Sequence, residues 1–414
     1  MKMKTSSKQT TPPASRYRAL AGILVSAIAL FGSPAWLRAQ TSLADVSVSD
    51  YGAKGDGVTD DTAAFTNAIA AAQSLNQNGV YVPMGKYVIK ATLTLNQLEL
   101  LGKFAGGWPA DSMPMPTLLL RHYTEPGLIL QDGSSVHGIA LDYDSGSPSN
   151  SIAPAISLQG QGVTLSSVRI QYPYDAITTL SNATPGRARF SDIFIVQPMN
   201  VGVQISKAYD FVQFHHIEVW CNSHLSTGSA FRLGRIDGGT FNGLVSYLVP
   251  TGVEIYTDTD AGGGTFTGSL LDCCSDQAST GVSITGDHTV NITAGDWDCN
   301  SYGAVIDGTN AQVTITGGKW HVNAAQGVKI TQGANVMLNA CMFYRSATAS
   351  ATFVWAANCT TVTVNGCQFL PGSTGLQLDN TVQRAIITAN SFEAGGIINN
   401  MTSSKQIIAN NLLP

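Results

Sequence analysis

Residues 50–89 read DYGAKGDGVTDDTAAFTNAIAAAQSLNQNGVYVPMGKYVI, and three local patterns follow one another in this stretch. A turn rich in Gly and Asp covers 52–61. Apolar side chains then recur with the i, i+3, i+4, i+7 spacing of one helix face, at Phe65, Ala68, Ile69 and Ala72. The pattern predicts an amphipathic helix that Thr59 caps, with Asp60 and Asp61 in its first turn, where carboxylates suit the helix dipole.

The helix is expected to stop at Asn78-Gly79, and a strand to begin at once. β-prone residues fill 80–82, a turn with Pro and Gly covers 83–85, and a second strand is expected at 87–89. This order resembles the N-terminal segment of the pectate-lyase-like superfamily, which polygalacturonase-like, rhamnogalacturonase/epimerase-like and tailspike proteins share. The resemblance implies an all-β fold, namely a single-stranded right-handed parallel β-helix with an N-terminal capping α-helix.

The chain downstream repeats itself. From residue 163, an apolar strand, a Gly-bearing turn and a second short strand recur roughly every 22–27 residues, which is typical of a stacked solenoid. The second strands read GVQIS, GVEIY, GVSIT, GAVID, GVKIT and GLQLD. One unit cannot bury its apolar face alone, so stacking is expected to create a continuous core. Aligning the units predicts one inward column: Ile170, Ile195, Val219, Val245, Leu270, Trp297, Trp320, Phe343, Phe369 and Phe392.

The N-terminus carries basic residues before an apolar run at 19–31, which is too short to span a bilayer. We therefore expect a signal peptide at 1–39 and a secreted or periplasmic β-helix domain at 40–414. The cap would occupy 40–90 and the regular coils 163–414. An uncleaved anchor is the alternative. No later stretch is apolar enough to span a membrane, so no membrane partner is expected after signal removal.

Composition narrows the possible partners. The formal net charge is −5 and only 12% of residues are charged, which gives no nucleic-acid signal. The seven cysteines form an odd set with no zinc-type spacing, so no metal centre is expected. Cys341 and Cys367 share a column in neighbouring coils, where strands lie about 4.8 Å apart. That spacing permits a disulfide, and a stacked pair of thiols fits equally well.

Charged residues interrupt the repeat in two adjacent coils. Asp296 and Asp298 flank the inward Trp297, and Lys319 and His321 flank Trp320, so their side chains should point outward. Stacking would place Asp296 beside Lys319 and Asp298 beside His321. Asp272 ends a strand in the coil before, and Tyr344 with Arg345 follows in the coil after.

Paired carboxylates that flank a glycosidic bond are the usual apparatus of glycoside hydrolysis. We therefore predict Asp296 and Asp298 as the acid and base, and His321 and Asp272 as further catalytic residues beside them. Lys319, Tyr344 and Arg345 are predicted to bind substrate. A solvated ladder of salt bridges across the coils is the alternative interpretation.

A second cluster lies upstream. Glu218 and Trp220 are outward by the same register, and an exposed Trp220 could stack on a sugar ring. Both are predicted to bind substrate. The alternative is that they are ordinary exposed residues near a turn, without a role in binding.

The catalytic motifs of the related families are absent from the coil region. These are Asn-Thr-Asp, Asp-Asp, Gly-His-Gly and Arg-Ile-Lys of polygalacturonases, Asp-Pro-His-Glu of alginate epimerases and Arg-x-Pro-x-x-Arg of pectate lyases. The first hypothesis is a polysaccharide hydrolase without a cofactor. A lyase or epimerase acting on a uronate-containing glycan, with Ca²⁺ as a possible ion, is the second. A non-catalytic glycan-binding or exopolysaccharide-assembly protein is the third. Tailspike-like relatives suggest a possible homotrimer.

Overall fold

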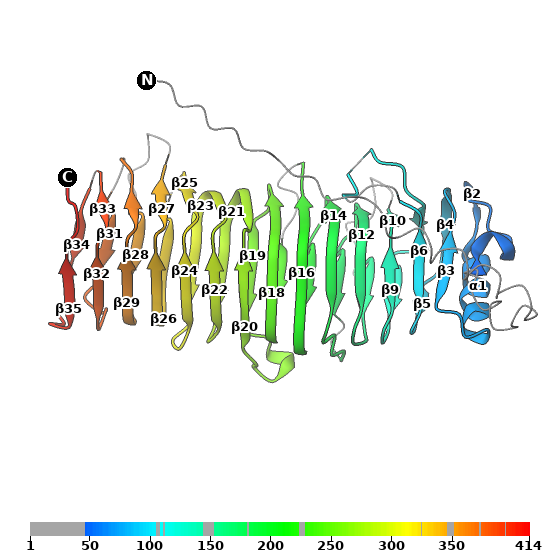
Figure 1. Ribbon diagram of the computed structural model, residues 1–414, viewed down its shortest axis with the longest axis horizontal. Helices are drawn as coiled ribbons and strands as arrows, with labels where there is room; N and C mark the ends of the chain where they lie inside the picture. The colour runs from blue at the N-terminus through cyan, green and yellow to red at the C-terminus, as the bar shows by residue number, and fades with distance from the viewer. Residues whose placement is uncertain are drawn as a thin grey trace, which may run out of the picture. The chain divides into compact units, whose positions relative to one another are not determined.

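The computed structural model describes residues 46–104, 108–110, 112–143, 153–179, 182–222, 228–323, 325–345, 352–371, 374–393 and 395–414. The signal peptide expected at 1–39 lies outside these residues. Within the described part, no helix is long and apolar enough to cross a lipid bilayer. Strands dominate this part, and each pairs in parallel with its counterpart one coil further along the chain. The prediction of an all-β parallel solenoid is therefore confirmed (Figure 1).

The coils build three parallel sheets that run the length of the solenoid. Sheet 1 contains β1 (Val46–Ser47), β3 (Gly79–Val82), β6 (Glu99–Gly102), β9 (Ser135–His137), β20 (Phe266–Leu271), β22 (Thr289–Thr293), β24 (Gln312–Thr316), β29 (Cys359–Asn365), β32 (Ala385–Thr388) and β35 (Gln406–Ala409). Sheet 2 contains β2 (Asp56–Asp60), β4 (Lys86–Ile89), β7 (Thr117–Leu120), β10 (Ala140–Asp142), β25 (Lys319–Val322), β27 (Met342–Tyr344), β30 (Gln368–Phe369) and β33 (Ser391–Phe392). Sheet 3 contains β5 (Leu93–Leu95), β8 (Leu128–Leu130), β11 (Ile156–Leu158), β13 (Ile177–Thr179), β15 (Val203–Ile205), β17 (Ser229–Leu233), β19 (Thr251–Tyr256), β28 (Val354–Ala356), β31 (Leu376–Leu378) and β34 (Ile397–Asn399).

Seven long strands bend from one sheet into the next. Those that run from sheet 1 into sheet 2 are β12 (Thr164–Gln171), β14 (Arg189–Val196), β16 (Ala208–Trp220) and β18 (Ile236–Tyr247). Those that run from sheet 2 into sheet 3 are β21 (Cys274–Thr285) and β23 (Asp296–Asp307), and β26 (Val328–Asn339) runs from sheet 3 into sheet 1. The segment 93–162, expected to form earlier coils, pairs in the same three sheets.

One sharp corner joins sheet 1 to sheet 2 in every coil. From the corner between β9 and β10 onward, these corners use a residue in the left-handed region, with φ between +47° and +70°. They include Gly138, Ser167, Asp192, His216, Gly243, Asp272, Ala294, Gly317, Ala340, Gly366 and Ala389. Glycine adopts this conformation without strain, whereas the other residues do so only because the coils above and below fix the corner.

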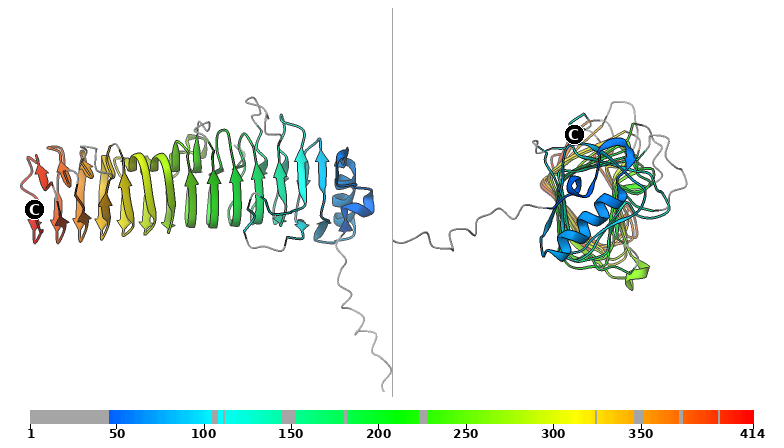
Figure 2. Two further views of the ribbon diagram at one scale, coloured as in Figure 1. Left: turned by 90° about the horizontal axis from the view of Figure 1, so that it is seen from above. Right: turned by 90° about the vertical axis from the view of Figure 1, so that its right-hand side faces the viewer.

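A short helical cap covers the N-terminal end of the core. η2 (Val48–Tyr51) and α1 (Thr62–Ser74) lie across the first coil, and the end-on view of Figure 2 shows α1 over the solenoid. The helical face predicted from the sequence is confirmed, because Phe65, Ala68, Ile69 and Ala72 are buried.

The predicted helix cap is wrong. Thr59 lies in β2, and Asp61 occupies the N-cap position. The Asp61 carboxylate is drawn instead to the preceding turn, where it accepts hydrogen bonds from the backbone N–H groups of Lys54 (2.7 Å) and Gly55 (3.1 Å). Asp60 accepts from the N–H of Thr62 (3.1 Å) and so satisfies one free donor of the first helical turn.

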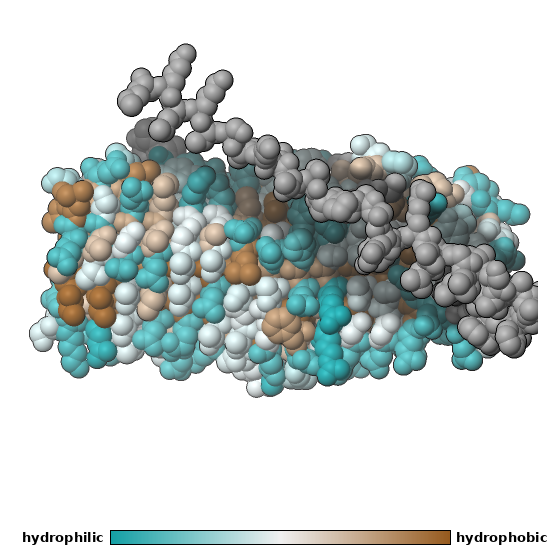
Figure 3. Space-filling model, in the orientation of Figure 1, coloured by the Kyte–Doolittle hydropathy of each residue, from teal (hydrophilic) through white to brown (hydrophobic). Residues whose placement is uncertain are grey.

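The opposite end of the solenoid carries no such cap among the described residues. All four residues of β35 are exposed, as are several apolar side chains around it: Ile398, Ile407, Ile408, Leu412 and Leu413. Figure 3 shows this contrast, because the lateral face is mainly hydrophilic to neutral while hydrophobic colour gathers at the end that carries β35.

The inner column of sheet 2 follows the predicted register except at two coils. Val219 pairs with Ser246, which pairs with Ser275, which pairs with Trp297. The predicted members Val245 and Leu270 are therefore wrong. Val245 pairs with Glu218 on the outer face, and Leu270 lies in sheet 1 beside Phe241. The coils at 236–271 contain register shifts that a fixed repeat does not anticipate.

Glycines at the start of the sheet 3 strands make room for this column. A Cβ on Gly281 would approach Cε3 of Trp297 to 3.0 Å, and a Cβ on Gly303 would approach Cε3 of Trp320 to 2.8 Å. The repeated GV and GA pairs of the second strands are thus explained by packing, since a larger residue would displace the ring opposite it.

Ser246 and Ser275 form a polar step in this apolar column. Both are buried, and their hydroxyl oxygens lie 2.8 Å apart. Replacing Ser275 alone by alanine should lower the free energy of unfolding by about 1–3 kcal/mol, because the hydroxyl of Ser246 loses its partner. The double replacement Ser246→Ala/Ser275→Ala should cost less than the sum of the two single ones. Urea unfolding followed by circular dichroism tests this, and strictly additive losses would contradict it.

The seven cysteines are free thiols in the structure. Cys341 and Cys367 are both buried in neighbouring coils and are in hydrogen-bond contact with each other. Of the two arrangements that the sequence left open, the structure contains the stacked thiols.

Candidate functional site

The outer face of sheet 2 carries a row of polar and aromatic side chains, one from each successive coil. Register pairs Trp220 with Tyr247, Tyr247 with Asp276, Asp276 with Asp298, Asp298 with His321, and His321 with Tyr344. We call these six residues the outer row. Successive members are about 4.8 Å apart at the backbone, because this is the spacing of neighbouring strands.

A second row runs parallel to it, two residues earlier on each strand. Its members are Glu218, Val245, Cys274, Asp296, Lys319 and Met342. The buried Trp297 and Trp320 lie between the two rows and hold their strands to the core, so that Asp296, Asp298, Lys319 and His321 all face outward.

The predicted stacking of charges between coils is confirmed. His321 Nδ1 lies 2.9 Å from Asp298 Oδ1, and the imidazole stacks on the ring of Tyr344 at 4.7 Å between centroids with a 4° interplanar angle. Stacking and the close contact with Asp298 together fix the orientation of His321, whose side chain is 18% exposed.

Lys319 forms the other predicted pair. Its Nζ lies 4.0 Å from Asp296 Oδ2, and both side chains are at least half exposed. An ion pair of this kind contributes little to stability, about 0–1 kcal/mol, since solvent screens it. The alternative interpretation, a ladder of salt bridges across the coils, would therefore add little to the stability of the protein.

Asp276 was not anticipated from the sequence and lies at the centre of the outer row. Burial raises the pKa of its carboxyl above the ordinary 3.8, and the nearby charges of Asp298 and Asp296 raise it further. Asp298, in contrast, has its carboxylate 2.9 Å from the imidazole of His321. Two neighbouring carboxyl groups in different environments are the usual sign of an acid and base pair.

The same negative charges act on the flanking side chains. Burial raises the pKa of the Tyr344 hydroxyl, with further contributions from Asp296 and Asp298. Burial raises the pKa of the Cys274 thiol to about 11, and the neighbouring carboxylates of both rows add to this. Both groups therefore remain protonated near neutral pH.

Trp220 and Tyr247 begin the outer row with a pair of aromatic rings. Their centroids are 6.0 Å apart and the rings are inclined by 13°. Both side chains are partly exposed, so the pair offers a flat apolar surface beside the carboxylates. Glu218 lies in the second row next to Trp220, as its predicted outward orientation requires.

The face is bounded one coil earlier by the segment after β6. Trp108 packs on Phe194 at 5.7 Å and on His216 at 4.1 Å between centroids. Arg169 holds the same segment through the carbonyls of Ala110 (2.9 Å) and Met113 (3.0 Å). The accessible part of the outer row therefore begins at Trp220.

Two predicted site residues do not join the rows. Asp272 occupies the left-handed corner between β20 and β21 and is exposed outside both rows. Arg345 is buried, with its guanidinium 5.6 Å from the ring centroid of Phe353, so its predicted place on the substrate-binding face is wrong. Arg345 directly follows the outward Tyr344, and successive side chains of an extended chain face opposite sides of a sheet.

The structure gives no sign of a metal centre on this face. Among the residues that it describes, no group of three or more His, Cys, Asp or Glu side chains could hold a metal ion. A separate pocket of about 320 Å³ lies on sheet 3, and none of the residues predicted from the sequence lines it.

Comparison with known proteins supports the fold. Residues 46–109 match the family model described as rhamnogalacturonase A/epimerase, pectate lyase-like, and residues 251–413 match the model for a right-handed β-helix region. The predicted handedness and superfamily are therefore confirmed.

Curated relatives match only a short segment. Plasmin and fibronectin-binding protein A of Streptococcus pneumoniae is 51% identical over 51 residues, which cover 12% of this chain and 7% of that protein. Mannuronan C5-epimerase AlgE1 of Azotobacter vinelandii is 54% identical over 43 residues, which cover 10% of this chain and 3% of that protein. The chain thus spans less than a tenth of the length of these relatives.

Solved structures match over most of the chain at low identity. The A-module of mannuronan C-5 epimerase AlgE6 of Azotobacter vinelandii has a TM-score of 0.62 at 15% identity, covering 89% of this chain and all of that one. A tailspike protein of E. coli bacteriophage HK620, in complex with a hexasaccharide, has a TM-score of 0.55 at 10% identity and covers 88% and 80%. Similarity at this level supports the shared fold.

Proposed function

Because the chain is a right-handed parallel β-helix with a pectate-lyase-like N-terminal segment, we propose that it is a polysaccharide hydrolase with its active site on the outer face of sheet 2. One observation carries the proposal. The outer row brings two aromatic rings, two carboxyl groups in different environments and an oriented histidine into a single line along the solenoid.

The aromatic pair would bind the glycan. Sugar rings have apolar faces, and flat aromatic side chains such as Trp220 and Tyr247 provide a large contact area at low cost in conformational entropy. The outer row runs along the solenoid axis, so a glycan stacked on these rings would extend over Asp276 and Asp298 in the next coils. The aromatic rings thus position the bond that the carboxyl groups attack.

The carboxyl groups would divide the acid and base roles. Asp276, whose pKa is raised above that of an ordinary carboxyl, is the better suited of the two to donate a proton to the oxygen of the leaving sugar. Asp298 would act as the ionised partner, either activating a water or attacking the anomeric carbon, with His321 fixing its orientation. Asp296 would add negative charge that favours the oxocarbenium-like transition state.

The charge of this face points to a neutral glycan. Glu218, Asp276, Asp296 and Asp298 lie on it, with Lys319 as the cation of the two rows. A polyuronate would be repelled, because like charges brought together across an interface disfavour binding. A lyase or epimerase would also need a base, and Tyr344 is poorly suited to that role since its pKa is raised.

The N-terminal residues support a site of action outside the cytoplasm. Basic residues precede an apolar run there, which is the pattern of an export signal. We therefore propose that the mature protein acts in the periplasm or in the medium.

Product analysis on a panel of neutral and uronate-containing polysaccharides tests the proposed function. Hydrolysis should release oligosaccharides that carry one added water, detected by mass spectrometry together with new reducing ends. Unsaturated products from a uronate polymer would instead assign a lyase. Binding to a glycan array without any release of oligosaccharides would assign a non-catalytic binding protein.

The pH profile should report the state of Asp276. Activity should fall as pH rises through its raised pKa, because only the protonated carboxyl can act as the acid. Asp296→Asn removes one of the charges that raise this pKa, so the descending limb should move to lower pH. Asp272→Asn, outside both rows, is the matched control and should leave the limb in place. A limb that moves to higher pH in Asp296→Asn would contradict the assignment.

A further inference from the structure

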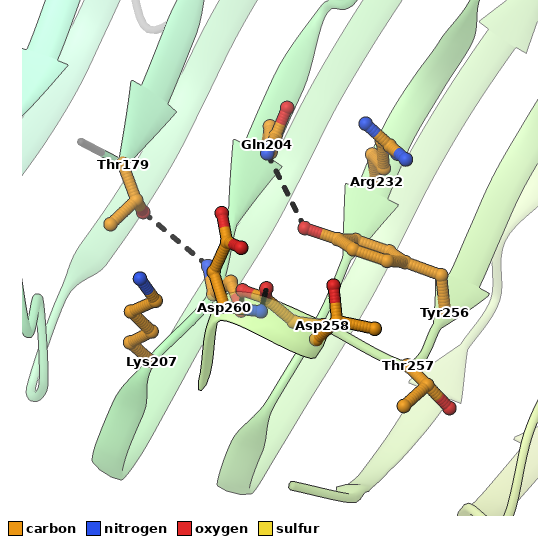
Figure 4. Close-up of a pocket in the computed structure, with 10 residues that line it drawn as sticks. Thr179, Gln204, Lys207, Arg232, Tyr256, Thr257, Asp258 and Asp260 are labelled. Carbon is orange, nitrogen blue, oxygen red and sulfur yellow. Dashed lines mark hydrogen bonds between the residues drawn. The ribbon is translucent and has the colours of Figure 1, made fainter. Parts of the chain in front are cut away.

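A polar pocket lies on sheet 3, on a different side of the solenoid from the outer row. Its volume is about 320 Å³, and three neighbouring strands contribute to it through Gln204 of β15, Arg232 of β17 and Tyr256 of β19. The turn that follows β19 supplies Asp258 and Asp260, and Figure 4 shows these carboxyl groups grouped with Lys207. η3 (Thr259–Ala261) forms part of this turn and projects from the edge of the solenoid in Figure 1.

The lining side chains are held in place by contacts among themselves. The hydroxyl of Ser206, which is 3% exposed, donates to Asp258 Oδ2, and the backbone N–H of Arg235 donates to the same hydroxyl oxygen at 3.1 Å. Gln204 Nε2 donates to the hydroxyl of Tyr256 at 3.3 Å. Such preorganisation lowers the entropy that a ligand would lose on binding.

Arg232 forms one wall of the pocket. Its Nε lies 3.3 Å from Glu254 Oε2, and its guanidinium lies 4.3 Å from the ring centroid of Tyr256. Ser229 donates to the same Glu254 oxygen at 2.6 Å and fixes that carboxylate. The guanidinium is thereby held between the Glu254 carboxylate and the Tyr256 ring. These two contacts restrict the directions in which its N–H groups can point.

A glycine lies against two of the residues that line the pocket. A Cβ on Gly234 would overlap the Ser206 hydroxyl and would approach Cζ of Tyr256 to 3.1 Å. The backbone of Gly234 has an ordinary φ, so space rather than conformation requires glycine here. A methyl group at this position would reduce the volume that a ligand could occupy.

The chemistry of the lining favours a neutral, hydroxyl-rich ligand. The cations Lys207 and Arg232 are balanced by Asp258, Asp260 and Glu254, so the pocket has little net attraction for an anion. Carboxylates accept hydrogen bonds from neighbouring hydroxyl groups, and the cationic side chains and Gln204 can donate to ring oxygens. Burial raises the pKa of Tyr256, and the charge of Asp258 adds to this, so that its hydroxyl stays a donor.

We infer that this pocket is a saccharide-binding site for one or two neutral sugar rings, separate from the outer row. Its volume is near the lower end of the usual range for ligand sites, about 300–1,000 Å³, which suits a sugar end or a short branch better than a long chain. Because sheets 2 and 3 are different faces, the pocket can be filled while a polymer lies on sheet 2. The inference therefore does not depend on hydrolysis at the outer row.

Titration of the full chain with small glycosides tests the inference. The probes are the methyl glycosides of glucose, galactose, mannose and N-acetylglucosamine, with glucuronic acid as the charged comparison, followed by saturation-transfer NMR and calorimetry. At least one neutral probe should bind, and Asp258→Asn should weaken it by roughly 10-fold or more, because a hydrogen bond to a charged group is lost. Gly234→Ala should weaken it through the loss of space.

Three control variants show whether binding belongs to this pocket. Asp379→Asn alters a carboxylate in the corresponding turn after β31, where it bonds Thr381, and should leave binding unchanged. Asp276→Asn and Trp220→Ala should also leave it unchanged. The inference is overturned if no neutral probe binds, if glucuronic acid binds more tightly, or if binding responds to the outer-row variants alone. Loss of hydrolysis in Asp258→Asn with full activity in Asp276→Asn would overturn both this inference and the proposed function.

Discussion

Replacing Asp276 by asparagine should lower the rate of glycan hydrolysis by about 10²–10⁴-fold, the usual contribution of a positioned general acid. The amide has nearly the shape of the carboxyl group but cannot donate a proton with the required acidity. Burial and the charges of Asp298 and Asp296 raise the pKa of Asp276. Its replacement by a neutral amide therefore also removes repulsion between these carboxylates. The midpoint of thermal unfolding should therefore stay the same or rise slightly while activity is lost.

Three variants distinguish the roles of neighbouring residues. Asp298→Asn should also abolish hydrolysis, whereas Asp272→Asn should retain it because Asp272 lies at a corner outside both rows. Trp220→Ala should mainly raise KM, since the ring would bind sugar at a distance from the reacting bond. Initial rates measured with reducing-end detection check each outcome. Full activity in both Asp276→Asn and Asp298→Asn would exclude the outer row as the catalytic site.

Replacing Trp320 by alanine should lower the free energy of unfolding by about 3–5 kcal/mol, as is typical for large aromatic residues in a packed core. Trp320 is fully buried, and its ring stacks on Trp297 at 5.4 Å and contacts Phe343 at 6.3 Å between centroids. Its Nε1–H also donates to the carbonyl of Gly317 at 3.3 Å. Removal of the ring leaves a cavity between two coils that their backbone pairing prevents from closing.

Trp220→Ala is the matched control for this loss. Trp220 lies on the same sheet with its ring on the outer face, so its replacement should cost roughly 1 kcal/mol or less. Urea unfolding followed by circular dichroism allows a direct comparison, because that signal does not depend on the tryptophans removed. Equal losses for Trp220 and Trp320 would contradict the inward and outward assignments of sheet 2.

The solenoid could be predicted from the sequence because the residues of each coil meet the same packing requirements. The apolar alternation of the strands, the GV and GA pairs of sheet 3 and the buried face of α1 all arise from local packing that a repeat makes visible. The pairing of Asp298 with His321 could be predicted for the same reason, since β23, β25 and β27 pair in sheet 2 without a register shift.

Prediction from the sequence failed where the strand register shifts, and where contacts between distant residues compete with local ones. Asp276 and Tyr247 were missed because Ser246 and Ser275, two small polar residues, occupy the inner column that was assigned to Val245 and Leu270. Thr59 was expected to cap α1, but the turn at 54–55 recruits Asp61 and shifts the start of the helix. The pocket on sheet 3 depends on residues about 25 positions apart along the chain, none of which forms a motif.

The left-handed corner between sheets 1 and 2 makes few demands on sequence, so a further coil could be inserted into the solenoid. A corner needs one residue that tolerates a positive φ, and Ser, Asp, His, Ala and Gly all serve in this chain. Because each coil packs only on its neighbours, a coil inserted between β18 and β21 would preserve the fold on either side. It would move the aromatic rings one rung, about 4.8 Å, away from the carboxyl groups. For the proposed hydrolase, the distance between the bound sugar and the cleaved bond would then depend on the number of coils between the aromatic rings and the carboxyl groups, and the length of the product would change with it.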